Sequence, residues 1–249
     1  MSKQKQDVVS ETALTEAVSQ EVAVASTLED WGQSDISSRD LIISKILAMQ
    51  GLSDLVTEGK AKIGDFVDSV SGEVLGSIDK PVEFIPFHME KVWIISTRNK
   101  GENKYEFDRY EPVTAENQGY PFEATEGNLE IKYEYTLQFY VLLAHDTSMP
   151  YVISFKSTSL RSGKVLSTQM YVRNKAAGLV PPAYTMELGG KKDKNDKGTF
   201  IVMETKPKAK TSNALIAESL NWFKVIKAGA VKVAAEKAEA SEFSGSAKF

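Results

Sequence analysis

The sequence predicts a mainly β domain of the α+β class, and three patterns carry this prediction. Residues 129–143 alternate between apolar and polar side chains, as a long strand with one core face does. Shorter runs rich in β-branched and aromatic residues lie on both sides of it, at 82–87 and 150–156. In the second half of the chain, residues 160–171 and 212–226 place apolar side chains at helical spacing. A sheet should therefore supply most of the core.

Composition bounds the class of protein. The chain has 249 residues, of which 42% are apolar and 26% charged, and it has no cysteine. One globular domain with attached arms fits these values, whereas disulfide frameworks, thiolate metal sites and cysteine nucleophiles are excluded. No run of 18 apolar residues occurs, and the first residues lack the apolar core of a signal peptide. We expect a cytoplasmic protein that neither spans a membrane nor is secreted.

The N-terminal part predicts an arm followed by a small layer. Residues 1–37 are polar and acidic, with too few apolar side chains for a core, and we expect a mobile arm. Asp40 is a candidate N-cap for a short buried helix that ends near Gly51. Residues 66–75 predict a hairpin that turns at Ser71 and Gly72. This helix and hairpin should precede the main sheet.

The centre of the chain predicts a run of strands. Residues 82–87 and 92–98 should form two strands, with Pro86 placing a break at an edge or bulge. A two-faced strand is expected at 105–110, because charged and aromatic residues alternate there. The long strand 129–143 and its partner at 150–156 are joined by a connection short enough for a hairpin.

The last third predicts a helix, two strands and a final helix. The helix after Ser159 must end before Pro181 and Pro182. Two strands, 184–188 and 199–204, are expected on either side of a polar, cationic loop at 189–198. Ser212 should cap an amphipathic helix, and the tail 229–249 should be flexible, which leaves one domain at 38–228.

No catalytic motif stands out. The chain has neither a phosphate-binding glycine loop of the Gly-x-x-x-x-Gly-Lys-Ser/Thr type nor a dinucleotide fingerprint. His88 and His145 are the only histidines, and neither has a second imidazole at metal-ligand spacing. The stretch from Asp193 to Gly198 resembles the start of a calcium loop, but Lys197 and the missing glutamate contradict that reading. We expect no enzyme, no metal and no cofactor.

Charge is distributed unevenly along the chain. Residues 1–155 hold 13 Lys and Arg against 26 Asp and Glu, whereas residues 156–210 hold 12 against 4. A strongly basic stretch in an otherwise acidic protein indicates a local surface that faces a polyanion.

The order of elements adds a fold to this charge pattern. Strands, then a helix, then two strands joined by a basic loop match the order of an OB-like antiparallel β-barrel, whose loops and strand faces often hold oligonucleotides. Binding of single strands needs cations for phosphates and aromatic faces for bases. The candidate phosphate contacts are Lys132, Lys156, Arg161, Lys164, Lys191, Lys192, Lys194 and Lys197. The candidate stacking rings are Trp93, Tyr105, Phe107 and Tyr140.

Each of these features also has a purely structural interpretation. Trp93 lies in an apolar strand and can belong to the core, and Tyr105 and Phe107 can do the same. The lysine-rich loop can be a solvated hairpin tip, and Arg161 and Lys164 can form the wet side of a helix. Only their combination favours nucleic-acid binding.

Several segments carry a family resemblance. Gly64-Asp65-Phe66, the strand at 82–86, the tyrosine-rich long strand and Asn-Asp-Lys-Gly-Thr-Phe at 195–200 resemble small bacteriophage proteins of replication and recombination modules. That resemblance, to OB-type single-stranded-DNA-binding proteins, implies a non-catalytic protein that coats exposed strands in the infected cytoplasm. It implies a phage polymerase or recombinase as partner, and an oligomer is compatible with it.

One departure and one rival function stay open. The acidic, phenylalanine-tipped tail of many such proteins is poorly matched, because Glu242 stands nearly alone and Lys248 adjoins Phe249. The rival is a phage structural or protein-interaction protein, such as a virion component or an inhibitor of a host factor, in which the basic stretch meets another protein.

Overall fold

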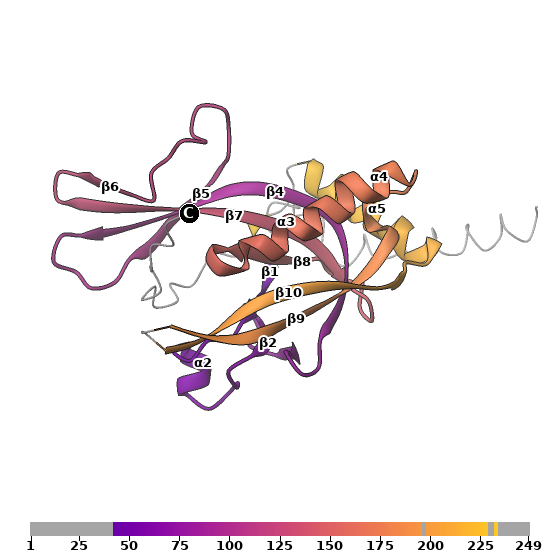
Figure 1. The fold of residues 1–249 in the computed structure, drawn as a ribbon, viewed down its shortest axis with the longest axis horizontal. Coiled ribbons are helices and arrows are strands. Elements are labelled where there is room, and N and C mark those ends of the chain that lie inside the picture. Colours follow the sequence, from indigo (N-terminus) through magenta and orange to yellow (C-terminus); the bar gives the residue numbers. More distant parts are fainter. Residues whose placement is uncertain (1–41, 196–197, 229–231, 234–249) are drawn as a thin grey trace, which may run out of the picture.

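The structure, a computed structural model, describes residues 42–195, 198–228 and 232–233 (Figure 1). The expected N-terminal arm and all but two residues of the expected C-terminal tail lie outside these ranges. The described strands form one mixed sheet in the order β10-β9-β4-β7-β8-β1-β2-β3, with β5, β6 and β11 as side branches. The prediction of a mainly β protein of the α+β class is confirmed.

Two long strands form the spine of the molecule. β4 (Val82–Asn99) and β7 (Leu129–Leu143) pair antiparallel along nearly their whole length. The predicted bounds of the long strand are confirmed, and so is the bulge predicted at Pro86. The two strands predicted at 82–87 and 92–98 are, however, one continuous strand. β4 continues through Pro86, because a β-bulge between Pro86 and His88 accommodates a residue that has no N–H to donate.

The second half of β4 and the first half of β7 project from the body of the molecule (Figure 1). β5 (Glu106–Pro112) pairs with β4, and β6 (Glu123–Glu126) pairs with β7. Trp93, Ile95 and Ile131 form the small core of this projection. The strand predicted at 105–110 is confirmed, and it begins one residue later than predicted, at Glu106.

The predicted helix near residues 41–51 is wrong. Ile42–Ala48 forms strand β1, which runs parallel to β8 (Tyr151–Lys156) and antiparallel to β2 (Asp65–Asp68). A short apolar run does not distinguish a buried strand from a buried helix, so the pairing with β8 decides. The hairpin of β2 and β3 (Val74–Ser77) is confirmed, and a one-turn helix, α2 (Asp54–Thr57), precedes it.

A helical segment covers one face of the sheet. It begins with the turn η3 (Ser157–Ser159) and runs through α3 (Leu160–Thr168), the π-helical turn η4 (Gln169–Arg173) and α4 (Asn174–Ala176). Leu166 and Met170 enter the main core with Leu137, Phe139 and Phe155. The predicted helix after Ser159 is confirmed.

The second helix, α5 (Asn213–Lys227), covers the opposite face. Its Trp222, Phe223 and Ile226 pack on a cluster that includes Tyr140 and Leu142. The cap at Ser212 is confirmed, because its hydroxyl accepts a hydrogen bond from the N–H of Leu215 at 3.4 Å. The second half of β7 is consequently buried on both faces, unlike the single core face that alternation predicted. A two-residue strand, β11 (Lys232–Val233), pairs with β1.

The predicted loop at 189–198 is largely strand. After the turn η5 (Pro181–Ala183), β9 (Tyr184–Asn195) and β10 (Gly198–Lys210) pair up to the tip, where Asn195 faces Gly198. β4 pairs with β9 only at residues 186–188, so the rest of β9 and β10 forms a two-stranded ribbon. We call residues 189–195 and 198–210 the lysine ribbon.

The sheet curls, but its two end strands, β3 and β10, are not paired by backbone hydrogen bonds in the described part of the chain. An OB-like barrel is therefore not confirmed. None of the described strand pairings joins β3 to β10. Side chains reach the free edge of β10 instead: Gln50 Oε1 accepts from Ile201 N–H at 2.7 Å, and Ser159 Oγ accepts from Met203 N–H at 3.0 Å. We call this contact the Gln50 seam.

Candidate nucleic-acid interface

Exposed cations gather on the tip of the lysine ribbon. Lys191, Lys192 and Lys194 lie on β9, beyond its last contact with β4. Lys192 and Lys194 lie on one face of the strand, and Lys191 lies on the other. The Lys191 ammonium lies 3.5 Å from the carboxylate of Glu204. The predicted Lys197 lies outside the described residues.

Further cations lie at the base of the ribbon, where sequence analysis placed none. Lys206, Lys208 and Lys210 are exposed on β10. Lys208 pairs with Glu83 and also lies 3.5 Å from Glu187, and its hydrogen bond with Glu83 raises the pKa of the ammonium group. Within the described ranges, no ion pair involves the side chains of Lys192, Lys194, Lys206 and Lys210. These four ammonium groups are available to an external polyanion.

The start of α3 adds two cations beside the ribbon. Arg161 and Lys164 are exposed, and the hydroxyl of Ser159, just before them, bonds to β10 at Met203. The predicted phosphate contacts on the helix and on β9 therefore lie on two elements that both adjoin β10.

Lys132 and Lys156 serve a different purpose from the one predicted. Lys132 is 7% exposed, with its ammonium 5.3 Å from the ring centroid of Phe122, and the Lys156 ammonium lies 3.3 Å from Glu134. Burial alone would raise the pKa of Glu134, but the charges of Lys156 and Lys132 outweigh it and lower that pKa. The charges of both lysines thus stabilise the ionised form of Glu134, whose side chain is 14% exposed. Neither lysine is an open contact for a phosphate.

Two of the predicted stacking rings are buried on the spine. Trp93 is 7% exposed, lies 5.5 Å from Tyr135 between ring centroids, and donates its N–H to Asn117 at 3.3 Å. Tyr140 is 5% exposed, and its ring stacks on His88 at 5.5 Å under helix α5. Neither ring offers an open face to a base.

The other two rings lie on or beside β5. Tyr105 is buried, with the guanidinium of Arg98 4.3 Å from its ring centroid. Phe107 is half-buried and lies 4.8 Å from Tyr110. Sequence reasoning assigned these aromatic residues by alternation alone, and the structure places them on other elements than the lysine ribbon.

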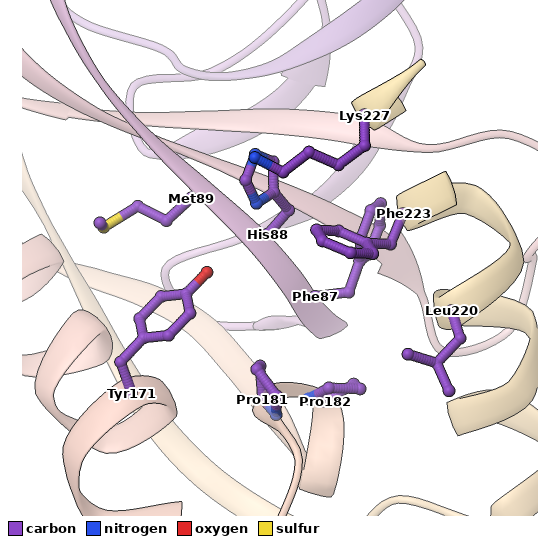
Figure 2. Close-up of a pocket in the computed structure, with 9 residues that line it drawn as sticks. All are labelled: Phe87, His88, Met89, Tyr171, Pro181, Pro182, Leu220, Phe223 and Lys227. Atoms are coloured by element: carbon purple, nitrogen blue, oxygen red, sulfur yellow. The ribbon is translucent and has the colours of Figure 1, made fainter. Parts of the chain in front are cut away.

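A pocket of about 550 Å³ lies at an interruption of the sheet (Figure 2). One edge of β4 is covered by β9 up to Phe84 and by β5 from Val92 onward, so Phe87 to Met89 have no strand neighbour there. The pocket opens at this place, between β4, η4, η5 and α5. It is lined by Phe87, His88, Met89, Tyr171, Pro181, Pro182, Leu220, Phe223 and Lys227.

Four of the nine residues that line the pocket carry aromatic rings. The imidazole of His88 lies 5.3 Å from the ring of Phe223, in an edge arrangement, and the Lys227 ammonium lies 5.9 Å from the same ring. Tyr171 enters from η4 (Figure 2), and its burial raises the pKa of its hydroxyl. Lys227 is the one exposed cation among the lining residues.

A carboxylate is held behind the His88 wall. Glu90 Oε1 lies 3.3 Å from His88 Nε2, and Glu90 Oε2 accepts a hydrogen bond from the Tyr140 hydroxyl at 3.0 Å. The bond with His88 lowers the pKa of Glu90 against the opposing effect of burial, and burial raises the pKa of Tyr140 well above its ordinary value. Both carboxylate oxygens of Glu90 therefore have hydrogen-bond partners. Glu90 is not among the residues that line the pocket.

Comparison with known proteins identifies the family. Residues 12–232 match the family described as Pam3 phage gp34-like protein. The chain belongs to this family. The match links the gp34-like chain to bacteriophages and spans nearly all of the described fold. No curated protein and no solved structure matches it.

Two other findings concern the described part of this gp34-like chain. No helix there is long and apolar enough to cross a membrane. No group of three or more His, Asp or Glu side chains there could hold a metal ion.

Sequence reasoning missed the pocket for a physical reason. Its walls come from β4, from the segment between η4 and η5, and from α5. The lining residues of β4 and η4, Met89 and Tyr171, are more than 80 residues apart along the chain. The only local signal was Pro181-Pro182, which predicted the end of a helix and nothing more.

Proposed function

We propose that this gp34-like protein binds single-stranded DNA without sequence preference, through contacts of the lysine ribbon with phosphates. The observation that carries the proposal is the set of exposed ammonium groups at Lys192, Lys194, Lys206 and Lys210, for which the described residues supply no carboxylate partner. The role is non-catalytic, in the cytoplasm of the infected host, beside a phage polymerase or recombinase.

An OB-like interpretation of the fold agrees with the same role. In this proposal the curled sheet acts as an OB-like scaffold, and the lysine ribbon takes the place of the basic loop between the last two strands. From Gly189 to Asn195, β9 pairs with β10 alone and not with β4, so the cations of this part stand on a two-stranded ribbon beyond the main sheet.

Salt dependence tests the phosphate contacts. Each lysine that neutralises a phosphate of a single strand contributes about 0.7 to the slope of log affinity against log salt. The triple variant Lys192→Gln, Lys194→Gln, Lys206→Gln should therefore reduce the slope by about 2. Fluorescence anisotropy with labelled dT20 between 50 and 200 mM salt, roughly the range in which such slopes are measured, gives the slope.

The matched control removes the same charge elsewhere. Lys91→Gln, Lys100→Gln and Lys104→Gln change three exposed lysines on or near the projection. We expect the control triple to keep the wild-type slope. Equal losses in both triples, or no binding of dT20 by the wild type at low salt, would refute phosphate binding by the ribbon.

A second candidate function is a protein contact in the phage particle or with a host factor. Val165, Val172, Leu179 and Val180 favour it, because they are 56%, 60%, 38% and 42% exposed along α3 and the segment that follows. Exposed apolar patches of this kind often mark protein interfaces. In this reading the neighbouring Arg161 and Lys164 meet an acidic protein surface.

Two measurements separate the candidates. Mass spectrometry of purified particles detects a virion component, and the dT20 titration detects an oligonucleotide binder. Presence in particles without affinity for dT20 supports the protein contact. Salt-dependent affinity for dT20 together with absence from particles supports the DNA-binding role.

A further inference from the structure

We propose that the pocket beside β4 accepts an unstacked base of the bound single strand. This inference rests on the proposed DNA-binding function and extends it, because it names the stacking site that the buried Trp93, Tyr105 and Tyr140 do not provide.

The chemistry of the walls suits the flat face of a base. Tyr171 and Phe223 are half-buried and bring rings to the space from two different helical segments (Figure 2). Phe87 and His88 are buried and close its β4 side, so Tyr171 and Phe223 are the rings that a base would meet. Base stacking on aromatic side chains tolerates any sequence, because every base has a π-face and no hydrogen-bond code is required. An apolar pocket with few polar atoms therefore fits non-specific binding.

The size of the pocket also fits. Its volume of about 550 Å³ lies inside the range of small-ligand sites, roughly 300 to 1,000 Å³. The pocket lies where one edge of β4 lacks a strand neighbour. Its position is therefore set by the backbone of the sheet and not by a single side chain.

The turn η5, which lines the pocket, adjoins the base of the lysine ribbon. Its prolines lead into β9, where Tyr184 pairs with Lys210, and the N–H of Thr211 donates to the carbonyl of Ala183 at 3.0 Å. Lys210 thus lies at the end of the ribbon that adjoins η5. A strand whose phosphates follow the ribbon reaches the pocket at its base.

Charge at the pocket favours a nucleotide over an uncharged apolar group. Lys227 is exposed at the wall formed by α5. Its charge helps to lower the pKa of the nearby Glu90, but the hydrogen bonds to that carboxylate come from His88 and Tyr140. In this proposal the exposed Lys227 ammonium meets the phosphate of the nucleotide whose base enters the pocket.

An oligomer without bases tests the inference on the unmodified protein. An abasic strand of the same length and charge as dT20 keeps every phosphate contact but has nothing to stack. We expect dT20 to bind about tenfold more tightly than the abasic strand at equal salt. Equal affinity of the two strands would overturn the inference and leave the proposed function intact, whereas binding of neither would overturn both.

A pocket-filling variant locates the effect. Leu220 is 41% exposed and lines the pocket from α5, so Leu220→Trp fills the space without removing buried packing. It should lower the affinity for dT20 to that for the abasic strand. Ala217→Trp, at an exposed position of the same helix outside the pocket, should leave both affinities unchanged. A Leu220→Trp protein that melts like the wild type and still prefers dT20 tenfold would contradict the assignment.

Lys227 offers a second, independent readout. Lys227→Gln should lower the salt slope by about 0.7, whereas Lys224→Gln, one turn earlier on the exposed side of α5, should not. If both variants keep the wild-type slope, no phosphate sits at Lys227. If Leu220→Trp removes a protein partner while DNA binding is unchanged, the pocket holds a protein segment and the inference is wrong.

Discussion

Glu134 shows how one residue decides the role of two predicted site residues. Its carboxylate is 14% exposed, accepts a hydrogen bond from Ser157, and lies 3.3 Å from the Lys156 ammonium. The lysines on its own face of the sheet, Lys132 and Lys156, lower its pKa. From the sequence, a lysine on the polar face of a strand is expected to be free to bind a ligand. A carboxylate beside it that is largely shielded from solvent makes it a structural counter-ion instead.

The lowered pKa of Glu134 predicts a dependence of stability on pH. Because the folded state holds this carboxyl ionised more strongly than the unfolded state does, its contribution is complete above the unfolded pKa of about 4.3 and is lost as pH falls through the lower folded pKa. Glu134→Gln should therefore cost about 2 kcal/mol of unfolding free energy at pH 7, and this difference should shrink below about pH 4.

Urea unfolding at neutral and acidic pH measures this effect. Glu126→Gln, at an exposed position on β6, serves as the control and should follow the wild type at every pH. A Glu134→Gln curve that stays parallel to the wild-type curve down to the most acidic point would show that the carboxyl is not stabilised by its lysines.

At the scale of elements, α3 shows why a residue that weakens a helix is retained. Glycine is less favourable than alanine inside a helix by about 1 kcal/mol. A Cβ atom at Gly163, however, would lie 2.6 Å from the Cβ of Phe155 and 3.3 Å from Leu137. The helix approaches β8 closely because this position has no side chain.

Gly163→Ala should therefore destabilise the protein, although propensity alone predicts the opposite. Overpacking against a rigid Cβ costs about 1 to 3 kcal/mol, which exceeds the gain in helix propensity. Thr168→Ala, on the exposed side of α3, should change stability by no more than about 0.5 kcal/mol. Chemical denaturation of both variants makes the comparison, and a stabilised Gly163→Ala protein would contradict the close approach.

Strand β1 shows the opposite case, in which local pattern favoured the wrong element. Residues 42–48 contain apolar side chains at both helical and strand spacings. Parallel pairing with β8 aligns Ile46 with Ile153 and buries both in the main core. A parallel partner more than 100 residues away leaves no local trace, so the sequence alone supports either element.

For the molecule as a whole, the Gln50 seam links the free edge of β10 to the segments that follow β1 and β8. The side-chain amide of Gln50 replaces a strand neighbour at Ile201, because its oxygen accepts the Ile201 N–H at 2.7 Å. Ser159 does the same for Met203. The seam also fixes the lysine ribbon against the start of α3, and so places Arg161 and Lys164 beside it.

Removal of the Gln50 acceptor should loosen the ribbon. Gln50→Ala leaves a partly buried N–H without a partner, which costs about 1 to 3 kcal/mol. Hydrogen exchange at the Ile201 amide should accelerate in Gln50→Ala, and Gln50→Glu, which keeps an acceptor oxygen, should show a smaller change. Unchanged exchange at Ile201 in Gln50→Ala would mean that the seam does not hold this edge.

The sequence by itself determined the features that depend on neighbours along the chain. Alternation located β7 to the residue, Ser71 and Gly72 located the β2–β3 turn, and Ser212 located the start of α5. Composition excluded disulfides, and the uneven charge indicated a basic surface in the stretch that became α3 and the lysine ribbon.

Only the tertiary structure decided which side chains are exposed and which segments meet. It made β1 a strand, extended β9 to Asn195, buried Trp93 and Tyr140, and formed the pocket between three distant segments. The reason is that a residue's own periodicity defines its face, but the burial of that face depends on the segment that covers it. Here α5 and the residues around Glu134 closed surfaces that alternation alone predicted to be open.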